Sequence, residues 1–388
     1  MNFFIKLFLF SQCILEVIAN NEGTFKANDN IESYGIRVKK SILNNMKRKW
    51  TFPIHYRIRG DVNKKTVETA LEIIQRETCI TFKETVNFTK GGLYYVNGSS
   101  ICASYVGKVS NDKPQDIILG KICNKVTTAI HETCHALGLI HEMTRHDRDS
   151  YVNVKYANIQ PRVAVNFDSF NLTMASSYGL KYDFGSVMHY DRFAASKNGQ
   201  FTMEPRNEIY LKTIGQSTRF GFNDAKQLNI HYCSDRCPEP KLKCKMNGYP
   251  NPNDCTVCKC PEFYTGTLCT KLKPSDKECG RRRFLKTRRT DQNLIVNGVK
   301  TCYIQITAPK GRKVRLYIEK TDLLYSFVCN PGHGLEVKFL NDKSVSGAMI
   351  CGKNYGKIII SENNVVAMKY IGLTQNSEIK IRYSDVAK

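Results

Sequence analysis

Apolar and polar residues follow two different periodicities in the first half of the chain. Between residues 52 and 58 every second residue is apolar, which predicts a half-buried strand. A following segment repeats its apolar residues at the three- and four-residue spacing of a helix, at Val67, Ala70, Leu71 and Ile74. Further apolar runs at 93–96, 101–109 and 117–119 predict more strands. We therefore expect an α+β domain, with a twisted sheet and helices before Gly138 and a loop-rich part after it.

The last part of the chain has a different pattern, made of short β-type runs separated by turn residues. The runs cover 303–307, 313–319, 335–340, 357–361, 365–371 and 379–383. Such a series of short strands predicts a β-sandwich. Ahead of it, six cysteines fall within residues 237–269. Because a segment this small cannot bury much apolar core, we expect disulfide bonds to hold it together, although the spacing alone leaves their pairing open.

The first forty residues differ from both of these parts. Residues 1–19 carry one positive charge followed by a mostly apolar stretch, which predicts a secretory signal peptide. A buried first strand fits less well, because Gln12 and Glu16 interrupt the apolar run. Residues 20–40 are polar and end in a basic site, so we interpret them as a propeptide whose removal leaves Ser41 first. No later segment approaches the roughly 18 consecutive apolar residues of a membrane helix, so we expect a soluble, secreted, extracellular protein.

Composition and charge indicate in which compartment the protein works and which class of partners it could bind. A chain of 388 residues suggests several domains, and its 16 cysteines indicate an oxidising compartment. Within the net charge of +23, six positive charges fall inside residues 281–289. This run could hold sulfated glycans or acidic matrix proteins, although a solvated loop explains it equally well, and nucleic acid is not expected outside the cell. Asn87, Asn97 and Asn171 head sequons for N-glycosylation.

The candidate chemistry lies in residues 127–149. His131 and His135 stand four residues apart, which on a helix places both imidazoles on one face, able to hold one metal ion. Gly138 can adopt a positive φ and end that helix, so that the chain turns back and brings His141 as a third ligand. Three neutral histidines leave one position open, which is typical of catalytic zinc. Glu132 can then act as the general base toward a water at the metal.

A second motif allows a family to be named. The sequence Ser186-Val187-Met188-His189-Tyr190 supplies a methionine turn downstream of the complete H-E-x-x-H-x-x-G-x-x-H motif, a combination typical of metzincins. Residues 141–149, HEMTRHDRD, resemble the H-E-x-x-R-x-D-R-D extension of astacin metallopeptidases, and SVMHY resembles their Met-turn. The resemblance covers about Trp50 to Cys233, and the whole chain looks like a nematode astacin with EGF-like and CUB domains.

This resemblance implies a two-lobed metzincin catalytic domain with substrate in the cleft between the lobes. It implies that Tyr190 stabilises the oxyanion, that Glu142 meets the mature N-terminus, and that residues 102–107 pair with an extended substrate. Arg192 or another basic residue would recognise an acidic side chain after the scissile bond. The family blocks its zinc with an F-x-G-D propeptide motif, whereas here Phe25-Lys26-Ala27-Asn28-Asp29 displaces both the glycine and the aspartate.

The resemblance also implies a domain order and a set of disulfide bonds. The expected order is a signal peptide (1–19), a propeptide (20–40), an astacin-like peptidase domain (41–234), an EGF-like module (235–270) and a CUB domain (279–385). The expected pairs are Cys79–Cys233, Cys102–Cys123, Cys237–Cys255, Cys244–Cys258, Cys260–Cys269, Cys279–Cys302 and Cys329–Cys351. Cys13 leaves with the signal peptide, and Cys134 is left over; a fourth metal ligand is conceivable there, but a buried free thiol fits better because His141 completes the ligand set.

Two functions remain open from the sequence. The first is a secreted endopeptidase that binds one Zn²⁺ and hydrolyses extended polypeptides outside the cell, with Glu132 and Tyr190 as catalytic residues. The second is a catalytically silent matrix or binding protein that acts through its EGF-like and CUB modules. The sequence favours the peptidase, because a silent site usually lacks a ligand or the base, and His131, His135, His141 and Glu132 are all present.

Overall fold

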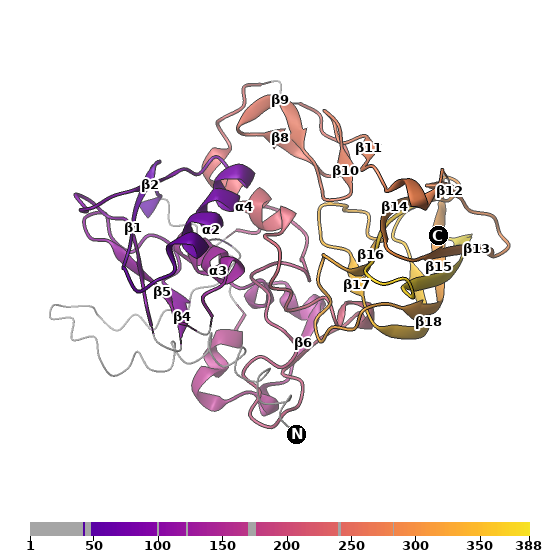
Figure 1. The fold of residues 1–388 in the computed structure, drawn as a ribbon, viewed down its shortest axis with the longest axis horizontal. Helices are drawn as coiled ribbons and strands as arrows, with labels where there is room; N and C mark the ends of the chain where they lie inside the picture. Colours follow the sequence, from indigo (N-terminus) through magenta and orange to yellow (C-terminus); the bar gives the residue numbers. More distant parts are fainter. Residues whose placement is uncertain are drawn as a thin grey trace. The chain divides into compact units, whose positions relative to one another are not determined.

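The computed structural model describes residues 42, 48–98, 101–121, 123–169, 176–239, 242–281 and 283–388. The expected signal peptide and propeptide, Ser41 and the sequon at Asn171 lie outside these residues. The chain forms two compact units (Figure 1). Unit 1 holds the described residues up to Tyr182, together with Val187–Arg206 and Asp224–Cys233. Unit 2 holds Asp183–Ser186, Asn207–Asn223 and Ser234–Lys388.

Unit 1 is built on a five-stranded sheet with the strand order β2-β1-β3-β5-β4. Its strands are β1 (Ile54–Ile58), β2 (Phe82–Glu84), β3 (Leu93–Val96), β4 (Cys102–Ser104) and β5 (Gln115–Leu119). All pair in parallel except β4, which is antiparallel to β5 and forms one edge of the sheet. The alternating strand predicted at 52–58 and the strands predicted at 93–96 and 117–119 are confirmed.

The strand predicted at 101–109 is wrong in length, because β4 ends at Ser104. Gly107 has a φ of 80°, which lies in the left-handed region and outside the range of regular strand backbone. Its N–H donates to the carbonyl oxygen of His135 at 2.8 Å instead of joining a β-ladder. The apolar run therefore continues past β4 as a loop that is tied to the end of a helix.

Two helices lie beside each other in unit 1 (Figure 1). Helix α2 (Lys64–Glu77) begins after Asn63, whose side chain accepts a hydrogen bond from the N–H of Thr66. It buries the residues that the spacing predicted, Val67, Ala70, Leu71 and Ile74. Helix α3 (Val126–Ala136) contacts α2, β4 and β5, and the Tyr95 hydroxyl of β3 lies 2.9 Å from the Thr133 hydroxyl. The sheet and α2 thereby hold α3 in place.

Apart from one helix, the remaining elements of unit 1 are short. β6 (Val152–Val154) pairs with β7 (Met203–Pro205). Short 3₁₀ helices cover Glu142–Thr144, Arg148–Ser150, Tyr156–Asn158 and Pro161–Phe167. Helix α4 (Phe222–Cys233) ends at the cysteine that is bonded to Cys79, and Cys102 is bonded to Cys123. The part after Gly138 is thus poor in long helices and strands, as expected from its pattern.

Unit 2 includes a small disulfide-rich segment. Its strands are β8 (Tyr249–Asn251), β9 (Asp254–Lys259), β10 (Tyr264–Thr265) and β11 (Lys271–Leu272), in two antiparallel pairs. Three disulfide bonds cross it, Cys237–Cys255, Cys244–Cys258 and Cys260–Cys269. Its core is small and centres on Phe263 and Tyr264, so these bonds supply much of the constraint that a larger core would give.

The rest of unit 2 contains two antiparallel-rich sheets, which we call the C-terminal sandwich. One sheet has the order β12-β14-β19-β16-β17 and the other β13-β20-β15-β18. The strands are β12 (Phe284–Lys286), β13 (Gln292–Asn297), β14 (Lys300–Thr307), β15 (Arg312–Asp322), β16 (Gly334–Lys338), β17 (Ala348–Ile350), β18 (Lys353–Ile360), β19 (Val365–Gly372) and β20 (Glu378–Ala387). Alternate residues of β15 are buried, and β15 contacts β19 of the other sheet. The six predicted runs correspond to β14, β15, β16, β18, β19 and β20.

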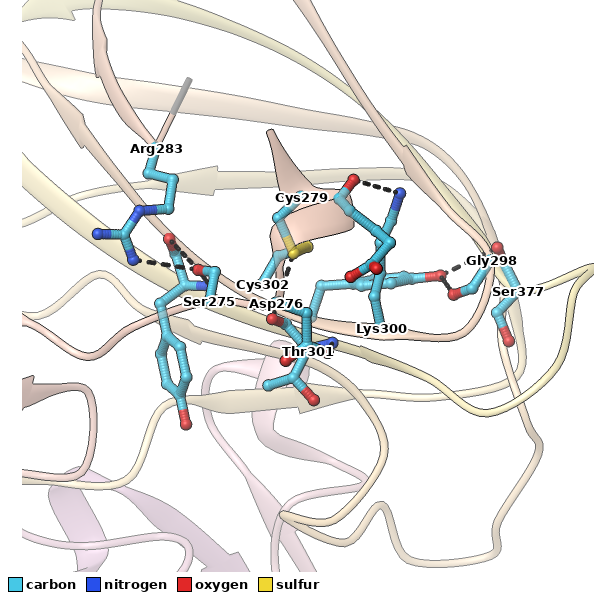
Figure 2. The surroundings of a disulfide bond; sticks show 12 residues. Ser275, Asp276, Cys279, Arg283, Gly298, Lys300, Thr301, Cys302 and Ser377 are labelled. Atoms are coloured by element: carbon cyan, nitrogen blue, oxygen red, sulfur yellow. Dashed lines mark hydrogen bonds between the residues drawn. A yellow bond between two sulfur atoms is a disulfide. The ribbon is translucent and has the colours of Figure 1, made fainter. Parts of the chain in front are cut away.

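Figure 2 shows how the chain enters the C-terminal sandwich. Cys279, in the 3₁₀ turn Lys277–Cys279, is bonded to Cys302 of β14. The N–H of Asp276 donates to the carbonyl oxygen of Thr301, and the N–H of Thr301 donates to the Asp276 carboxylate. The guanidinium of Arg283 donates to the Ser275 hydroxyl at 3.2 Å and to a backbone carbonyl oxygen at 2.8 Å. One member of the basic run at 281–289 is therefore engaged in holding the fold.

Six charged residues of unit 2 form a largely buried group, which we call the charge cluster. Its members are Asp183, Arg219, Glu262, Glu336, Lys338 and Lys369. Arg219 lies 2.6 Å from Glu262 and 3.4 Å from Glu336, and Lys369 lies 3.3 Å from Glu336. Three positive and three negative side chains thus balance in a place with little water, as buried charges require. A further disulfide of unit 2, Cys329–Cys351, lies within the sandwich.

We expect Glu336→Gln to destabilise unit 2 at neutral pH but not in acid. Burial alone would raise the pKa of Glu336, but the charges of Arg219, Lys369 and Lys338 outweigh burial and bring the pKa well below 4.5. The carboxylate therefore stabilises the fold above about pH 4.5, and this contribution is lost as the pH falls further. Removing one partner of a buried pair costs about 3–5 kcal/mol. Melting temperatures of variant and wild type should differ clearly at pH 7 and converge only near pH 2, where the carboxyl group of the folded protein becomes protonated; an equal gap at both values would contradict the prediction.

Candidate metal centre

Helix α3 carries two of the three predicted ligands and is buried along almost its whole length. His131 and His135 are one turn apart on it, and both are 6% exposed. The helix ends as the sequence predicted: Gly138 has a φ of 101°, and the N–H of Leu139 donates to the carbonyl oxygen of Cys134 at 2.9 Å. The turn brings His141 back to the other two histidines, so that one ring nitrogen from each lies within 4.8 Å of the others.

Hydrogen bonds fix which ring nitrogen of the helix histidines faces the centre. His131 Nδ1 lies 2.8 Å from the carbonyl oxygen of Val187, and His135 Nδ1 lies 2.8 Å from that of Leu139. A carbonyl oxygen only accepts, so in both rings Nδ1 carries the proton and the neutral ring presents a lone pair at Nε2. These two carbonyl groups orient the ligands in the way that second-layer partners of metal sites do.

The free lone pairs fit a metal ion. His131 Nε2 is buried and has no hydrogen-bond partner among the described residues. His135 Nε2 and His141 Nε2 lie 3.2 Å apart, and three imidazoles are a common donor set for zinc. Burial lowers the pKa of His131 to about 4 and that of His135 to about 3, and it brings the pKa of His141 well below 6.5. All three rings are therefore neutral at physiological pH, as metal ligands must be.

Glu132 is next to the first ligand and is 1% exposed. Burial raises the pKa of its carboxyl group to about 8, because it removes the water that would stabilise the charged form, and no hydrogen bond or charge from the described part of the chain compensates for that loss. A divalent cation held by the adjacent imidazoles would act in the opposite direction and favour the carboxylate. The site therefore places a poorly solvated proton acceptor beside the three ligands, which is what a general base needs.

The methionine turn lies against these ligands within unit 1. The carbonyl oxygen of Met188 accepts a hydrogen bond from the N–H of Glu142 at 2.9 Å, and Met188 is 2% exposed. The ring of Tyr190 lies 4.3 Å from that of His141, centroid to centroid. The Tyr190 hydroxyl is buried and has no hydrogen-bond partner among the described residues. Such a hydroxyl is available to a group that enters the site.

Other predicted residues lie outside the ligand cluster. Glu142 forms an ion pair with Arg145 at 3.2 Å, while the mature N-terminus that the resemblance brings to it lies beyond the described residues. Arg192 is buried, and its guanidinium lies over the rings of Phe193 and Phe201. Cys134 is a buried free cysteine whose pKa burial raises well above 9.0, so the thiol stays protonated. The expectation that Cys134 is a buried free thiol is confirmed, and its exclusion from the ligand set stays a prediction.

The sequence did not predict the groups around the site that orient its ligands through hydrogen bonds. These are the carbonyl groups of Val187 and Leu139 and the carboxylate of Asp224, which accepts from the N–H of Val187 at 3.0 Å. Backbone carbonyl groups carry no residue signature, and Asp224 is far from the motif in sequence. The three histidines and Gly138, by contrast, had a spacing in the sequence that could be read directly.

Comparison with known proteins shows which family and which relatives this chain is similar to. Residues 42–233 match the model of the peptidase family described as Astacin. Zinc metalloproteinase nas-34 of Caenorhabditis elegans is 35% identical, over 96% of this chain and 62% of the relative. Zinc metalloproteinase nas-26 of the same organism is 30% identical, over 84% of this chain and 79% of the relative. The chain thus spans less than two thirds of nas-34 and more than two thirds of nas-26.

Among solved structures, the chain is similar to the high choriolytic enzyme 1, a hatching enzyme zinc-protease from the medaka fish Oryzias latipes. The identity is 27% and the TM-score 0.43, over 53% of this chain and 98% of that one. Within the part of the chain that the structure describes, none of the helices is both long and apolar enough to cross a membrane.

Proposed function

Because this chain belongs to the astacin family of peptidases, we propose that it is a secreted, zinc-dependent endopeptidase acting on extracellular polypeptides. The observation that supports this most strongly is the arrangement of His131, His135 and His141. Their ring nitrogens converge, two of the rings are oriented by backbone carbonyl groups, and a buried carboxylate, Glu132, is adjacent.

The residues divide the work of peptide hydrolysis between them. His131, His135 and His141 would hold one zinc ion through their Nε2 atoms. The bound ion supplies the positive charge that makes water nucleophilic near neutral pH. Glu132 takes the proton from the water that attacks the scissile carbonyl group and returns it to the leaving amine. The Tyr190 hydroxyl, which is buried and unpaired among the described residues, donates a hydrogen bond to the oxyanion as it develops.

An extended substrate fits the edge of the sheet in unit 1. β4 is the last strand of its sheet, so one of its sides is not paired within the sheet. A cavity adjoins this strand and is lined by Ala103, Ser104 and Tyr105 together with residues of the following loop and of β5. A peptide that adds to β4 as a further strand would be gripped through its backbone, and cavities beside it would select side chains.

We also propose that the two parts of unit 2 are an EGF-like module at 235–270 and a CUB-like domain at 279–385. Three disulfide bonds within a small segment support the first, and two sheets with two disulfide bonds support the second. Exposed positive residues of the run at 281–289, such as Lys286 and Arg289, would bind sulfated glycans or acidic matrix proteins. A variant in which these positive residues are substituted should no longer be retained on a heparin column. Unchanged retention of that variant would contradict this role.

Secretion and glycosylation complete the proposal. Seven disulfide bonds support an oxidising compartment. Asn87 is exposed, as an N-glycosylation site must be, and Asn97 is half-buried. Mass spectrometry of secreted protein, before and after removal of N-glycans, would find glycans at Asn87, Asn97 and Asn171; an unmodified Asn87 would remove the best supported of these sites.

Cleavage of a peptide library by the mature form that begins at Ser41 tests the proposed activity. We expect cleavage inside the peptides, loss of cleavage after treatment with a chelator, and recovery when zinc is added back. The pattern of cleaved bonds would at the same time give the specificity. A folded, zinc-loaded protein that cleaves nothing would favour the alternative, a binding protein that acts through unit 2.

A further inference from the structure

The segment that leads into the methionine turn contacts the C-terminal sandwich within unit 2. The N–H of Ser346 donates to Asp183 Oδ1 at 3.0 Å, and the same oxygen accepts from the N–H of Gly185 at 3.0 Å. A Cβ atom placed on Gly185 would lie 2.5 Å from the Cβ atom of Ser346. The approach is so close that only glycine fits at this position. The segment therefore packs directly against the sandwich at Gly185.

Arg219 joins the same segment to the charge cluster by a second route. Its Nη1 lies 2.6 Å from Glu262 and 3.4 Å from Glu336, and its Nη2 lies 3.3 Å from the Ser346 hydroxyl. Its backbone N–H donates to Gln216 Oε1 at 3.1 Å. Gln216 Nε2 in turn donates to the carbonyl oxygen of Gly185 at 2.8 Å. Arg219, whose guanidinium is held by Glu262 and Glu336, thus fixes the side chain of Gln216. That side chain in turn holds the carbonyl oxygen of Gly185.

The neighbouring part of the segment 207–223 lies along the edge strand β17. The N–H of Met349, in β17, donates to the Thr213 hydroxyl at 2.9 Å. The N–H of Cys329 donates to the carbonyl oxygen of Lys212 at 2.8 Å. The edge of this sheet is therefore engaged by the chain itself, which distinguishes it from an open surface that recruits substrates.

We propose that Arg219 is a positioning residue, through which the C-terminal sandwich holds the backbone that orients the metal ligand His131. The chain runs without interruption from Gly185 through Ser186 to Val187, whose carbonyl oxygen accepts from His131 Nδ1 at 2.8 Å. A shift at Gly185 therefore moves the acceptor that aligns the imidazole. This inference rests on the proposed peptidase function and gives the sandwich a role in the chain's own active site.

The test compares full-length Arg219→Met with a matched control, Asp385→Asn. Asp385 is also a buried carboxylate of unit 2, but its partner is Arg312 and it does not belong to the charge cluster. Zinc release to a chelator, kcat and KM are measured where circular dichroism shows both variants folded. We expect zinc release to become about 2- to 30-fold faster in Arg219→Met, with a lower kcat and an unchanged KM. Arg219→Lys, which keeps the charge, should recover part of the loss, and Asp385→Asn should behave as wild type.

The outcomes separate positioning from simple stabilisation. If Arg219→Met releases zinc and turns over substrate as Asp385→Asn does, the charge cluster only stabilises unit 2 and the proposal is overturned. If Arg219→Met does not fold, Gln216→Met takes its place, since it removes the donor to Gly185; wild-type zinc release in that variant would equally overturn the proposal. A wild-type protein without peptidase activity would refute the proposed function, whereas zinc release would still decide the role of Arg219.

Discussion

Replacing Glu132 by alanine is expected to lower kcat by about 10²- to 10⁴-fold while zinc stays bound, because a positioned general base contributes a factor of this size. The carboxylate is buried beside the ligands but is not one of the three converging imidazoles. Its loss should therefore leave the metal-binding atoms in place and remove only the proton acceptor. The measurement is steady-state cleavage of a peptide found in the library, with zinc content determined on the same sample.

Tyr190→Phe is the comparison for this experiment, because it removes one hydroxyl and keeps the ring that packs against His141. It should lower kcat by less than Glu132→Ala does, since it weakens stabilisation of the oxyanion without removing the base. Near-normal turnover by zinc-loaded Glu132→Ala would rule out its role as base. Loss of zinc from that variant would instead show that the carboxylate helps to hold the metal.

The second large effect is expected from His141→Ala, which should reduce zinc from about one ion per chain towards none and abolish cleavage. His141 lies on the turn after α3, and removing it leaves the two α3 histidines as a pair. A pair of imidazoles from one helix cannot supply the three-ligand set of a catalytic zinc site. Atomic absorption on protein purified by gel filtration gives the zinc content directly.

His146→Ala serves as the matched control for His141→Ala. His146 lies in the same run of sequence and is half-buried, but it does not belong to the histidine cluster. The control should keep its zinc and its activity. Full zinc occupancy in His141→Ala would contradict the assignment of the third ligand, and equal zinc loss in both variants would indicate a general defect of folding.

The parts of the fold that the sequence predicted correctly are those set by local spacing. The apolar positions of α2, the alternation in β1 and the turn at Gly138 each depend on residues close together in the chain. The strand predicted at 101–109 failed because a distant acceptor, the carbonyl oxygen of His135, captures the N–H of Gly107. β12 and β17 were missed because each has only three residues, too few to show a period.

In the candidate site, too, residues related by local spacing could be predicted, and residues brought together only by the tertiary fold could not. The ligands His131 and His135 could be predicted because one helical turn is enough to bring them together. Spacing also indicated His141, through the glycine turn. The carbonyl oxygen of Val187 and the carboxylate of Asp224 could not be predicted, because they come from segments that only the tertiary fold brings close to α3. The membership of Asp183–Ser186 in unit 2 has no sequence signal either.

The disulfide bond between Cys79 and Cys233 has a practical consequence for a protein that is proposed to cut others. The two cysteines are 154 residues apart, and α3, the turn with His141 and the methionine turn all lie between them. A single cut in any loop of this interval would leave both fragments covalently joined. Autolysis would then go unnoticed on a non-reducing gel, and nicked molecules would still purify together with intact ones.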